Sequence, residues 1–313
     1  MAQITRTTKE GEVFSGKPKR VSWERLWAFS GGPFRLEGWP TKNIHTDLPF
    51  AQKSGLPYVA ASATQYHGYA VELLIDVFGT AWLSHGWMDV KFINLVNAND
   101  TLVAKASVLA RQEQGGATKF TLDISCENQK GEKALVGQAT GVIGQFRTPG
   151  PEGYQKRVAE LKADPAIQKA VDRPGMSSLE YMVTPELNQQ YLYAGEDYNR
   201  CYVEETEFGP PVTHPGLILN WSNVTRSPSY VRGGVGREGS LHTQDECFWY
   251  NPARLGKKLI VTWPGSVGTY ERRGRFYYIN EALVVDEDGR EIVRRLSRGA
   301  LVSTPEKPYQ KTK

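Results

Sequence analysis

The sequence predicts an α+β fold in which one unit, a long helix wrapped by a curved antiparallel sheet, occurs twice in tandem. Two observations support this prediction: strand-like segments whose residues alternate between apolar and polar, and the return of the same segments in the same order later in the chain. Phe92 in the first half corresponds to Phe248 in the second, and the turn residue Gly131 corresponds to Gly289 at nearly the same interval. A near-constant interval over several strands indicates duplication.

Each half is expected to contain four strands, because this alternation is the pattern of an antiparallel strand with one buried face. The turns NAND and QKGE separate strands of the first half, and the turn DEDG separates the last two strands of the second half. The expected strands cover residues 87–96, 101–110, 119–128 and 133–144, then 246–252, 257–263, 275–285 and 290–302.

A helix is expected ahead of each set of strands. In the second half it begins near Thr213, which can cap it, and Pro215 suits its first turn. Both helices are apolar on most sides, which is typical of a helix enclosed by a sheet. In the first half the apolar residues recur at spacings of four and three, the period of a helix, at Val59, Ala63, Tyr66, Ala70, Leu73 and Val77.

The domain boundaries follow from the repeat. Residues 1–146 are expected to form the N-terminal unit, and residues 180–313 the C-terminal unit. Between them, residues 147–179 carry proline and glycine at both ends of a charged amphipathic stretch, which predicts a linker with a surface helix.

The composition excludes several classes of protein. The 313 residues are 40% hydrophobic with a net charge of +4 and no dense basic runs, which favours a globular protein that binds no nucleic acid. No apolar run is long enough to cross a membrane and the N-terminus lacks a signal-peptide pattern, so a cytoplasmic protein is expected. The spacing of Cys126, Cys201 and Cys247 suits neither a disulfide framework nor a CxxC metal site, and no metal site is expected.

Two loops carry a more specific signal. The first half reads KNIHTDLPFAQKSGLPYVAAS over residues 42–62, and the second half reads YLYAGEDYNRCYVEETEFGPPVTHPGL over residues 191–217. These segments resemble the MaoC-like enoyl-CoA hydratases and dehydratases, whose pattern is S-G-D-x-N-P-I-H-x-D followed by A-H-G at the start of the central helix. The resemblance covers nearly all of residues 10–146 and 180–303, and it implies the double hotdog fold.

The resemblance also implies an activity: a hydro-lyase that adds water to, or removes it from, an acyl-CoA thioester. It implies no metal and no redox cofactor, since coenzyme A is part of the substrate. In the family an Asp and a His on one loop supply the acid and the base, and the helix start supplies an N–H for the carbonyl. The first half keeps His45 and Asp47, but Gly32 or Pro40 stands where the family Asp is expected.

The second half keeps the family Asp and Asn but lacks the family His, and it is the preferred site. Asp197 is predicted as the general base, Asn199 as the residue that orients substrate or water, and Tyr202, which replaces the family His, as the proton donor. His214 and Gly216 are predicted to bind the thioester carbonyl, Gly216 through an N–H left unpaired in the first turn of the helix. The alternative is that Asp197 and Asn199 only hold their turn.

The remaining candidates each have two interpretations. His45 is either catalytic or a structural, substrate-lining residue, and Asp47 either contacts substrate or caps the short helix that follows it. The basic turn formed by Arg272, Arg273 and Arg275 either binds the phosphates of coenzyme A or is solvated surface.

Two other functions stay open because both loops are incomplete: a thioester hydrolase on the same fold, and a non-catalytic acyl-CoA-binding subunit. A homodimer is expected, although duplication already supplies the twofold partner and permits a monomer. Aromatic residues in the second half predict a bulky or ring-bearing acyl group if they line one pocket, whereas a packed core explains them equally well: Tyr191, Tyr193, Tyr198, Trp221, Phe248, Trp249 and Tyr250.

Overall fold

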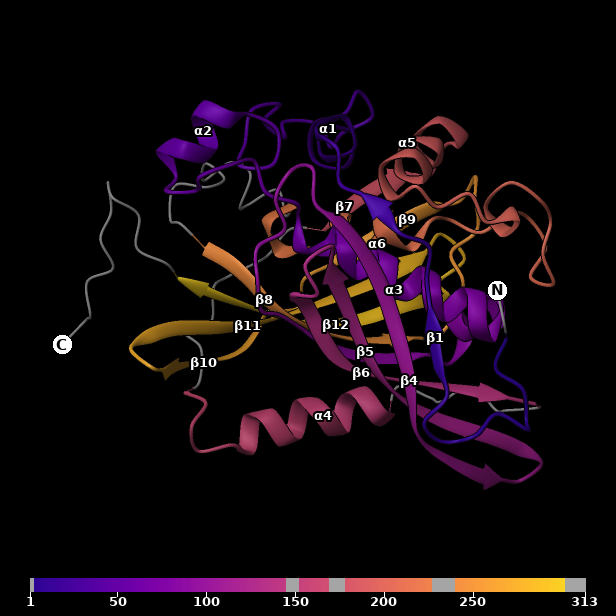
Figure 1. Ribbon diagram of the computed structural model, residues 1–313. Coiled ribbons are helices and arrows are strands. Elements are labelled where there is room, and N and C mark those ends of the chain that lie inside the picture. Colours follow the sequence, from indigo (N-terminus) through magenta and orange to yellow (C-terminus); the bar gives the residue numbers. More distant parts are fainter. Residues whose placement is uncertain (1–2, 145–151, 169–177, 227–239, 302–313) are drawn as a thin grey trace.

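A single curved antiparallel sheet of twelve strands dominates the computed structural model, which describes residues 3–144, 152–168, 178–226 and 240–301 (Figure 1). Ten of the strands follow one path, β1-β4-β5-β6-β3-β8-β12-β11-β9-β7, while β2 pairs with β4 and β10 pairs with β11. The first-half strands are β1 (Val13–Ser15), β2 (Lys19–Arg20), β3 (Trp87–Phe92), β4 (Thr101–Gln114), β5 (Ala117–Asn128) and β6 (Lys133–Ile143). The second-half strands are β7 (Leu179–Met182), β8 (Ser240–Trp249), β9 (Lys258–Thr262), β10 (Ser266–Arg272), β11 (Arg275–Asp286) and β12 (Glu291–Leu301).

The two halves meet where β3 pairs with β8. In this antiparallel pair Trp87 lies opposite Phe248 and Met88 lies opposite Cys247. Outward from the pair the strand order is mirrored: β6 and β12, then β5 and β11, then β4 and β9, with β1 and β7 at the two edges. The repeat predicted from the strand pattern is therefore confirmed as one continuous sheet shared by both units.

Two helices lie inside the curve of this sheet, α3 (Ala63–Phe78) and α6 (Pro215–Trp221) (Figure 1). Nearly every residue of α3 and every residue of α6 is buried, as their apolar sequences require. They pack closely at two glycines, since a Cβ atom on Gly68 would lie 3.5 Å from the Cα atom of Gly216. Small residues at this crossing let the two backbones approach, so each helix reaches the other unit.

A second helix pair, α1 (Trp23–Gly31) and α5 (Pro185–Gly195), packs together at the top of the view in Figure 1. Their N-caps are Ser22 and Thr184, whose side chains accept the N–H groups of Arg25 and Leu187. The other short helices are α2 (Leu48–Lys53) and the 3₁₀ turns η1 (Thr80–Ser84), η2 (Arg200–Tyr202) and η3 (Val224–Arg226).

Helix α4 (Glu152–Ala163) lies along the bottom of the view, inside the segment predicted to be a linker with a surface helix. It buries Tyr154 and Leu161 against Val267, Ile279 and Leu296 of the second-half sheet. The predicted domain boundaries at residues 146 and 180 remain predictions.

The structure differs from the sequence-based elements in several places. Strand β3 ends at Phe92 and β8 at Trp249, several residues earlier than expected, while the expected Val302 lies outside the described residues. The predicted N-cap of α6, Thr213, was also wrong. His214 is the N-cap, and its ring nitrogen accepts the Gly216 N–H. The elements missed entirely are short edge strands and helices outside the sheet, where alternation is too brief to read: β1, β2, β7, β10, α1 and α5.

No helix among the described residues is both long and apolar enough to cross a membrane.

Candidate active site

The structure brings together three residues predicted in the second half. Asp197 lies in the loop between α5 and η2, Tyr202 is the last residue of η2, and His214 is the N-cap of α6. His214 Nε2 is 3.4 Å from Asp197 Oδ2, and the ring centroids of Tyr202 and His214 are 5.2 Å apart. All three side chains are buried, with at most 2% of each residue exposed. These groups therefore face one another rather than an open pocket.

The His214 ring occupies a slot between two glycines. A Cβ atom on Gly216 would lie 2.8 Å from the imidazole carbon Cε1, and one on Gly195 would lie 3.1 Å from it. His214 Nδ1 accepts the N–H of Gly216 at 3.1 Å, so this nitrogen carries no proton and the ring proton is on Nε2, toward Asp197. The expectation that the Gly216 N–H is unpaired was wrong, because the preceding residue itself caps the helix.

Buried charges surround this cluster. Lys19 Nζ lies 2.5 Å from Glu72 Oε2 and donates to the carbonyl oxygens of Gly195 and Glu196. Burial alone would raise the pKa of Asp197, but the neighbouring His214, Lys19 and Tyr202 hold it below its ordinary value. Burial and the Asp197 charge raise the pKa of Glu72 to about 8 despite the Lys19 cation. The negative charge of Asp197 thus disfavours ionisation of the neighbouring Glu72 carboxyl group.

Asn199 faces a different space. Its Nδ2 donates to Asp76 Oδ1 at 3.1 Å, and both residues line a cavity of about 300 Å³. Its Oδ1 accepts the Cys201 N–H at 3.2 Å, and its own N–H donates to Asp197 Oδ1 at 3.2 Å. Asp197 and Asn199 therefore hold their turn, as the alternative interpretation expected. Their predicted catalytic roles stay predictions.

In the loop motif of the first half, His45 stands where the second half has Tyr202. Its Nδ1 is 2.7 Å from the Ala60 carbonyl oxygen, an acceptor, so Nδ1 carries the proton. Its backbone N–H donates to Asn43 Oδ1 at 2.9 Å. Burial, reinforced by the Arg226 cation, lowers the pKa of His45 to about 4. The ring is therefore neutral at pH 7, and among the described residues Nε2 has no hydrogen-bond partner.

The two central helices begin differently. The His214 ring caps α6 by accepting the Gly216 N–H, whereas the side chain of Ser62, the N-cap of α3, accepts no backbone N–H of the first turn. The hydroxyl of Ser62 is instead 2.8 Å from that of Thr64. Because His45 is bonded to Ala60, two residues before Ser62, its imidazole lies beside the uncapped helix start.

No protein-family model matches this sequence, and no curated protein matches it. Solved structures match its fold. A MaoC domain protein dehydratase of Chloroflexus aurantiacus aligns with a TM-score of 0.66 at 13% identity, covering 96% of this chain and 97% of that one. A conserved hypothetical protein of Mycobacterium tuberculosis, described as a double hotdog, aligns with a TM-score of 0.59 at 13% identity, covering 94% and 96%. A MaoC-like dehydratase of Phytophthora capsici aligns with a TM-score of 0.51 at 15% identity, covering 92% and 95%.

The chain is a double hotdog protein. Its fold is the one found in these three structures, two of which are MaoC dehydratases, as the loop motifs implied. At identities of 13% to 15% the likeness concerns the fold alone.

The remaining predicted site residues of the double hotdog are Asp47 and three arginines. Asp47 caps α2 through the Phe50 N–H at 2.8 Å, as one interpretation expected. Arg272, Arg273 and Arg275 are exposed at the turn between β10 and β11. In Figure 1 this hairpin turn is on the opposite side of the view from the loop after α5 that carries Asp197. The substrate-binding roles of Asp47 and of the three arginines stay predictions.

The aromatic residues do not gather in one pocket of the double hotdog. Tyr193 and Tyr198 are exposed, and Phe248 packs against Tyr154 of α4. The others are buried in the core, which agrees with the packing interpretation: Tyr191, Trp221, Trp249 and Tyr250. A bulky acyl group stays a prediction.

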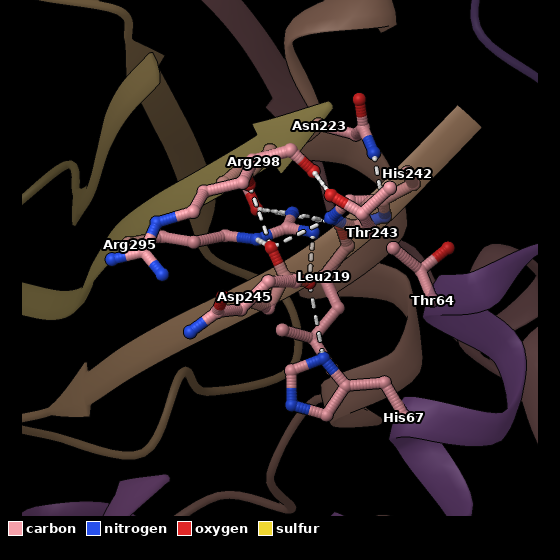
Figure 2. Close-up of polar contacts among 12 residues, drawn as sticks. Thr64, His67, Leu219, Asn223, His242, Thr243, Asp245, Arg295 and Arg298 are labelled. Carbon is pink, nitrogen blue, oxygen red and sulfur yellow. Dashed lines mark hydrogen bonds and ion pairs between the residues drawn. The ribbon is translucent and has the colours of Figure 1, made fainter. Parts of the chain in front are cut away.

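Sequence reasoning missed a buried polar cluster inside the double hotdog, centred on Asp245 of β8 (Figure 2). Its carboxylate accepts from Arg295, Ser297, His242 and His67, at distances between 2.5 and 3.2 Å. Arg295 also donates to the Leu219 carbonyl oxygen of α6, so the cluster joins α3, α6, β8 and β12.

A signal for this cluster was present in the sequence. His67 lies among the mostly apolar residues of the first-half helix, whereas Asp245 and Arg295 lie in strands with several other polar residues and do not stand out. A polar side chain inside a buried helix needs a partner, so His67 indicated a buried partner without saying which.

Proposed function

We propose that this double hotdog protein is a hydro-lyase that adds water to, or removes it from, the α,β bond of an acyl-CoA thioester. The observation that carries the proposal is the neutral His45 imidazole beside the uncapped start of α3. The Gln65 N–H donates to the Ser62 carbonyl oxygen at 2.9 Å, but no described residue accepts the N–H groups of Ala63 and Thr64. These two N–H groups suit a thioester carbonyl oxygen, which gains negative charge as the enolate forms. The start of α6 lacks this feature, since His214 already occupies it.

His45 has the protonation state that a general base needs. With the proton on Nδ1 held by the Ala60 carbonyl, Nε2 can accept a proton from water as the water oxygen bonds to the β carbon. The same proton can then pass from Nε2 to the α carbon as the enolate collapses. One imidazole thus performs both transfers, which offsets the absence of the family Asp from this loop. The reaction requires neither a metal nor a redox cofactor, and coenzyme A enters only as part of the substrate.

The test is a direct assay of the purified protein with crotonyl-CoA and longer enoyl-CoAs. Loss of the conjugated thioester absorbance without release of free thiol supports hydration. Thiol release would instead identify a thioester hydrolase, and tight binding without either change would identify a non-catalytic acyl-CoA-binding subunit. Both of these outcomes overturn the proposal.

A further inference from the structure

Arg226 is a buried cation with no counter-ion among the described residues. Only 4% of the residue is exposed, and no described carboxylate pairs with it. The single hydrogen bond that described residues provide runs from Nη2 to the neutral Asn220 Oδ1 at 2.9 Å, and Nε is buried without a partner. Burial lowers the pKa of Arg226 to about 10, which still leaves the guanidinium charged at neutral pH. A buried charge of this kind is costly unless a partner binds to it.

The guanidinium is held in position by groups that cannot neutralise it. Its central carbon lies 3.4 Å from the ring centroid of Trp39. Asn220 is itself fixed, because its Nδ2 donates to the Phe29 carbonyl oxygen at 2.9 Å and to the Tyr191 hydroxyl at 2.6 Å. The guanidinium group of Arg226 is therefore held in a fixed orientation before any ligand binds, as in a preorganised anion-binding site.

Arg226 also belongs to the surroundings of His45. Trp39, which stacks on the guanidinium, donates its indole N–H to the Ser30 carbonyl oxygen at 2.8 Å. Asn43 donates to the same oxygen at 3.2 Å, and its own Oδ1 holds the His45 backbone N–H. The Ser30 carbonyl oxygen thus links Trp39, which stacks on Arg226, to Asn43, which positions His45.

We propose that Arg226 binds a carboxylate on the acyl group, so that the substrate is the thioester of a dicarboxylic acid. The proposal rests on the proposed function, since His45 defines the reacting end of the acyl chain. The other anions of such a substrate are the phosphates of coenzyme A. A carboxylate at the end of a short acyl chain suits a buried guanidinium beside the reacting end better than a nucleotide phosphate does, and a guanidinium binds a carboxylate through two parallel hydrogen bonds.

Equilibrium binding of saturated thioesters tests this without requiring turnover. Glutaryl-CoA and pentanoyl-CoA differ by a carboxylate in place of a methyl group and carry the same phosphates. By calorimetry, the wild-type protein should bind glutaryl-CoA at least about tenfold more tightly. Arg226→Gln should remove most of that preference while leaving pentanoyl-CoA affinity within about twofold. Arg111→Gln, which removes one positive charge from the surface of β4, is the matched control and should preserve the preference.

Stability of the free protein separates ligand binding from a structural role. Because no carboxylate in the described part of the chain pairs with Arg226, Arg226→Gln should melt at or above the wild-type temperature, and Arg226→Lys should keep part of the preference for glutaryl-CoA. Equal binding of the two thioesters, binding of neither, or a parallel loss of both in Arg226→Gln would overturn the proposal. The crotonyl-CoA assay answers separately whether the protein is a hydro-lyase.

Discussion

Asp245 and Arg295 form an ion pair in which neither side chain is exposed to solvent, with Arg295 Nη2 2.5 Å from Asp245 Oδ2 and Nε 2.9 Å from Oδ1. The pair joins β8 to β12, and Arg295 extends it to the Leu219 carbonyl of α6. Burial alone would raise the pKa of Asp245, but the Arg295 cation, with His242 and His67, holds it well below its ordinary value. This ionised pair therefore orients the second-half helix against the sheet.

Removing one member of this pair should destabilise the protein strongly. Arg295→Met leaves the Asp245 carboxylate buried without its arginine partner, and a loss of about 3–5 kcal/mol in the free energy of unfolding is expected. Arg298→Met, in the same strand but only partly buried, should change it by less than about 1 kcal/mol. Urea unfolding followed by circular dichroism measures both. Equal effects of the two substitutions would contradict a special role for the pair.

Catalysis should depend on the first-half loop more than on the second. His45→Gln removes the proton acceptor, and turnover of the active enoyl-CoA should fall by about a hundredfold or more. Asp197→Asn and Tyr202→Phe should reduce turnover much less, because both residues are buried against His214 at the start of the other central helix, α6. The measurement is kcat and KM for each correctly folded variant. A collapse of turnover in Asp197→Asn with His45→Gln near wild type would move the site to the second half.

Gly216→Ala should disturb the slot that holds the His214 ring. The new Cβ would lie 2.8 Å from the ring atom Cε1, closer than real side chains pack, so the ring must move and its bond to the residue 216 N–H must weaken. A loss of about 1–3 kcal/mol in stability is expected from this overpacking. Gly16→Ala is the control, since its Cβ would meet nothing closer than 3.5 Å. If both variants unfold at the same urea concentration, the slot is not tight.

Stability should rise with pH between about 4 and 6.5. Burial lowers the folded-state pKa of both His45 and His85 to about 4, from 6.5 in the unfolded chain. In this range the unfolded chain binds more protons than the folded one, so acid favours unfolding and raising the pH restores stability. Urea unfolding at a series of pH values should give a shallower slope for His45→Gln and for His85→Gln than for the wild type. An unchanged slope in both variants would show that neither histidine is kept neutral by the fold.

Much of the architecture could be predicted because its signals are local. Alternation along strands such as 133–144 depends only on which side chains face the core, and Gly131 and Gly289 both adopt a positive φ that their turns require. The repeat of these signals implied two equivalent units. Short edge elements such as β7 gave too few residues to show a period.

The candidate site was predicted only in part. The loop motifs identified His45, Asp197 and His214 as residues of interest, but a motif does not say which atoms face one another. Whether a helix start is open depends on a side-chain rotamer, and His214 closes α6 while Ser62 leaves α3 uncapped.

By itself the sequence determined the duplicated strand order, the two central helices and the loops that precede them, because periodicity and turn chemistry act between residues close in the chain. Only the tertiary structure decided which charges are paired, since Asp245 meets Arg295 of another strand and Arg226 meets Trp39 of the other unit. The cost of burying a charge can be judged only once its neighbours are known. That is why the Asp245–Arg295 pair, and the lack of a carboxylate partner for Arg226 within residues 3–144, 152–168, 178–226 and 240–301, could be recognised only in the fold.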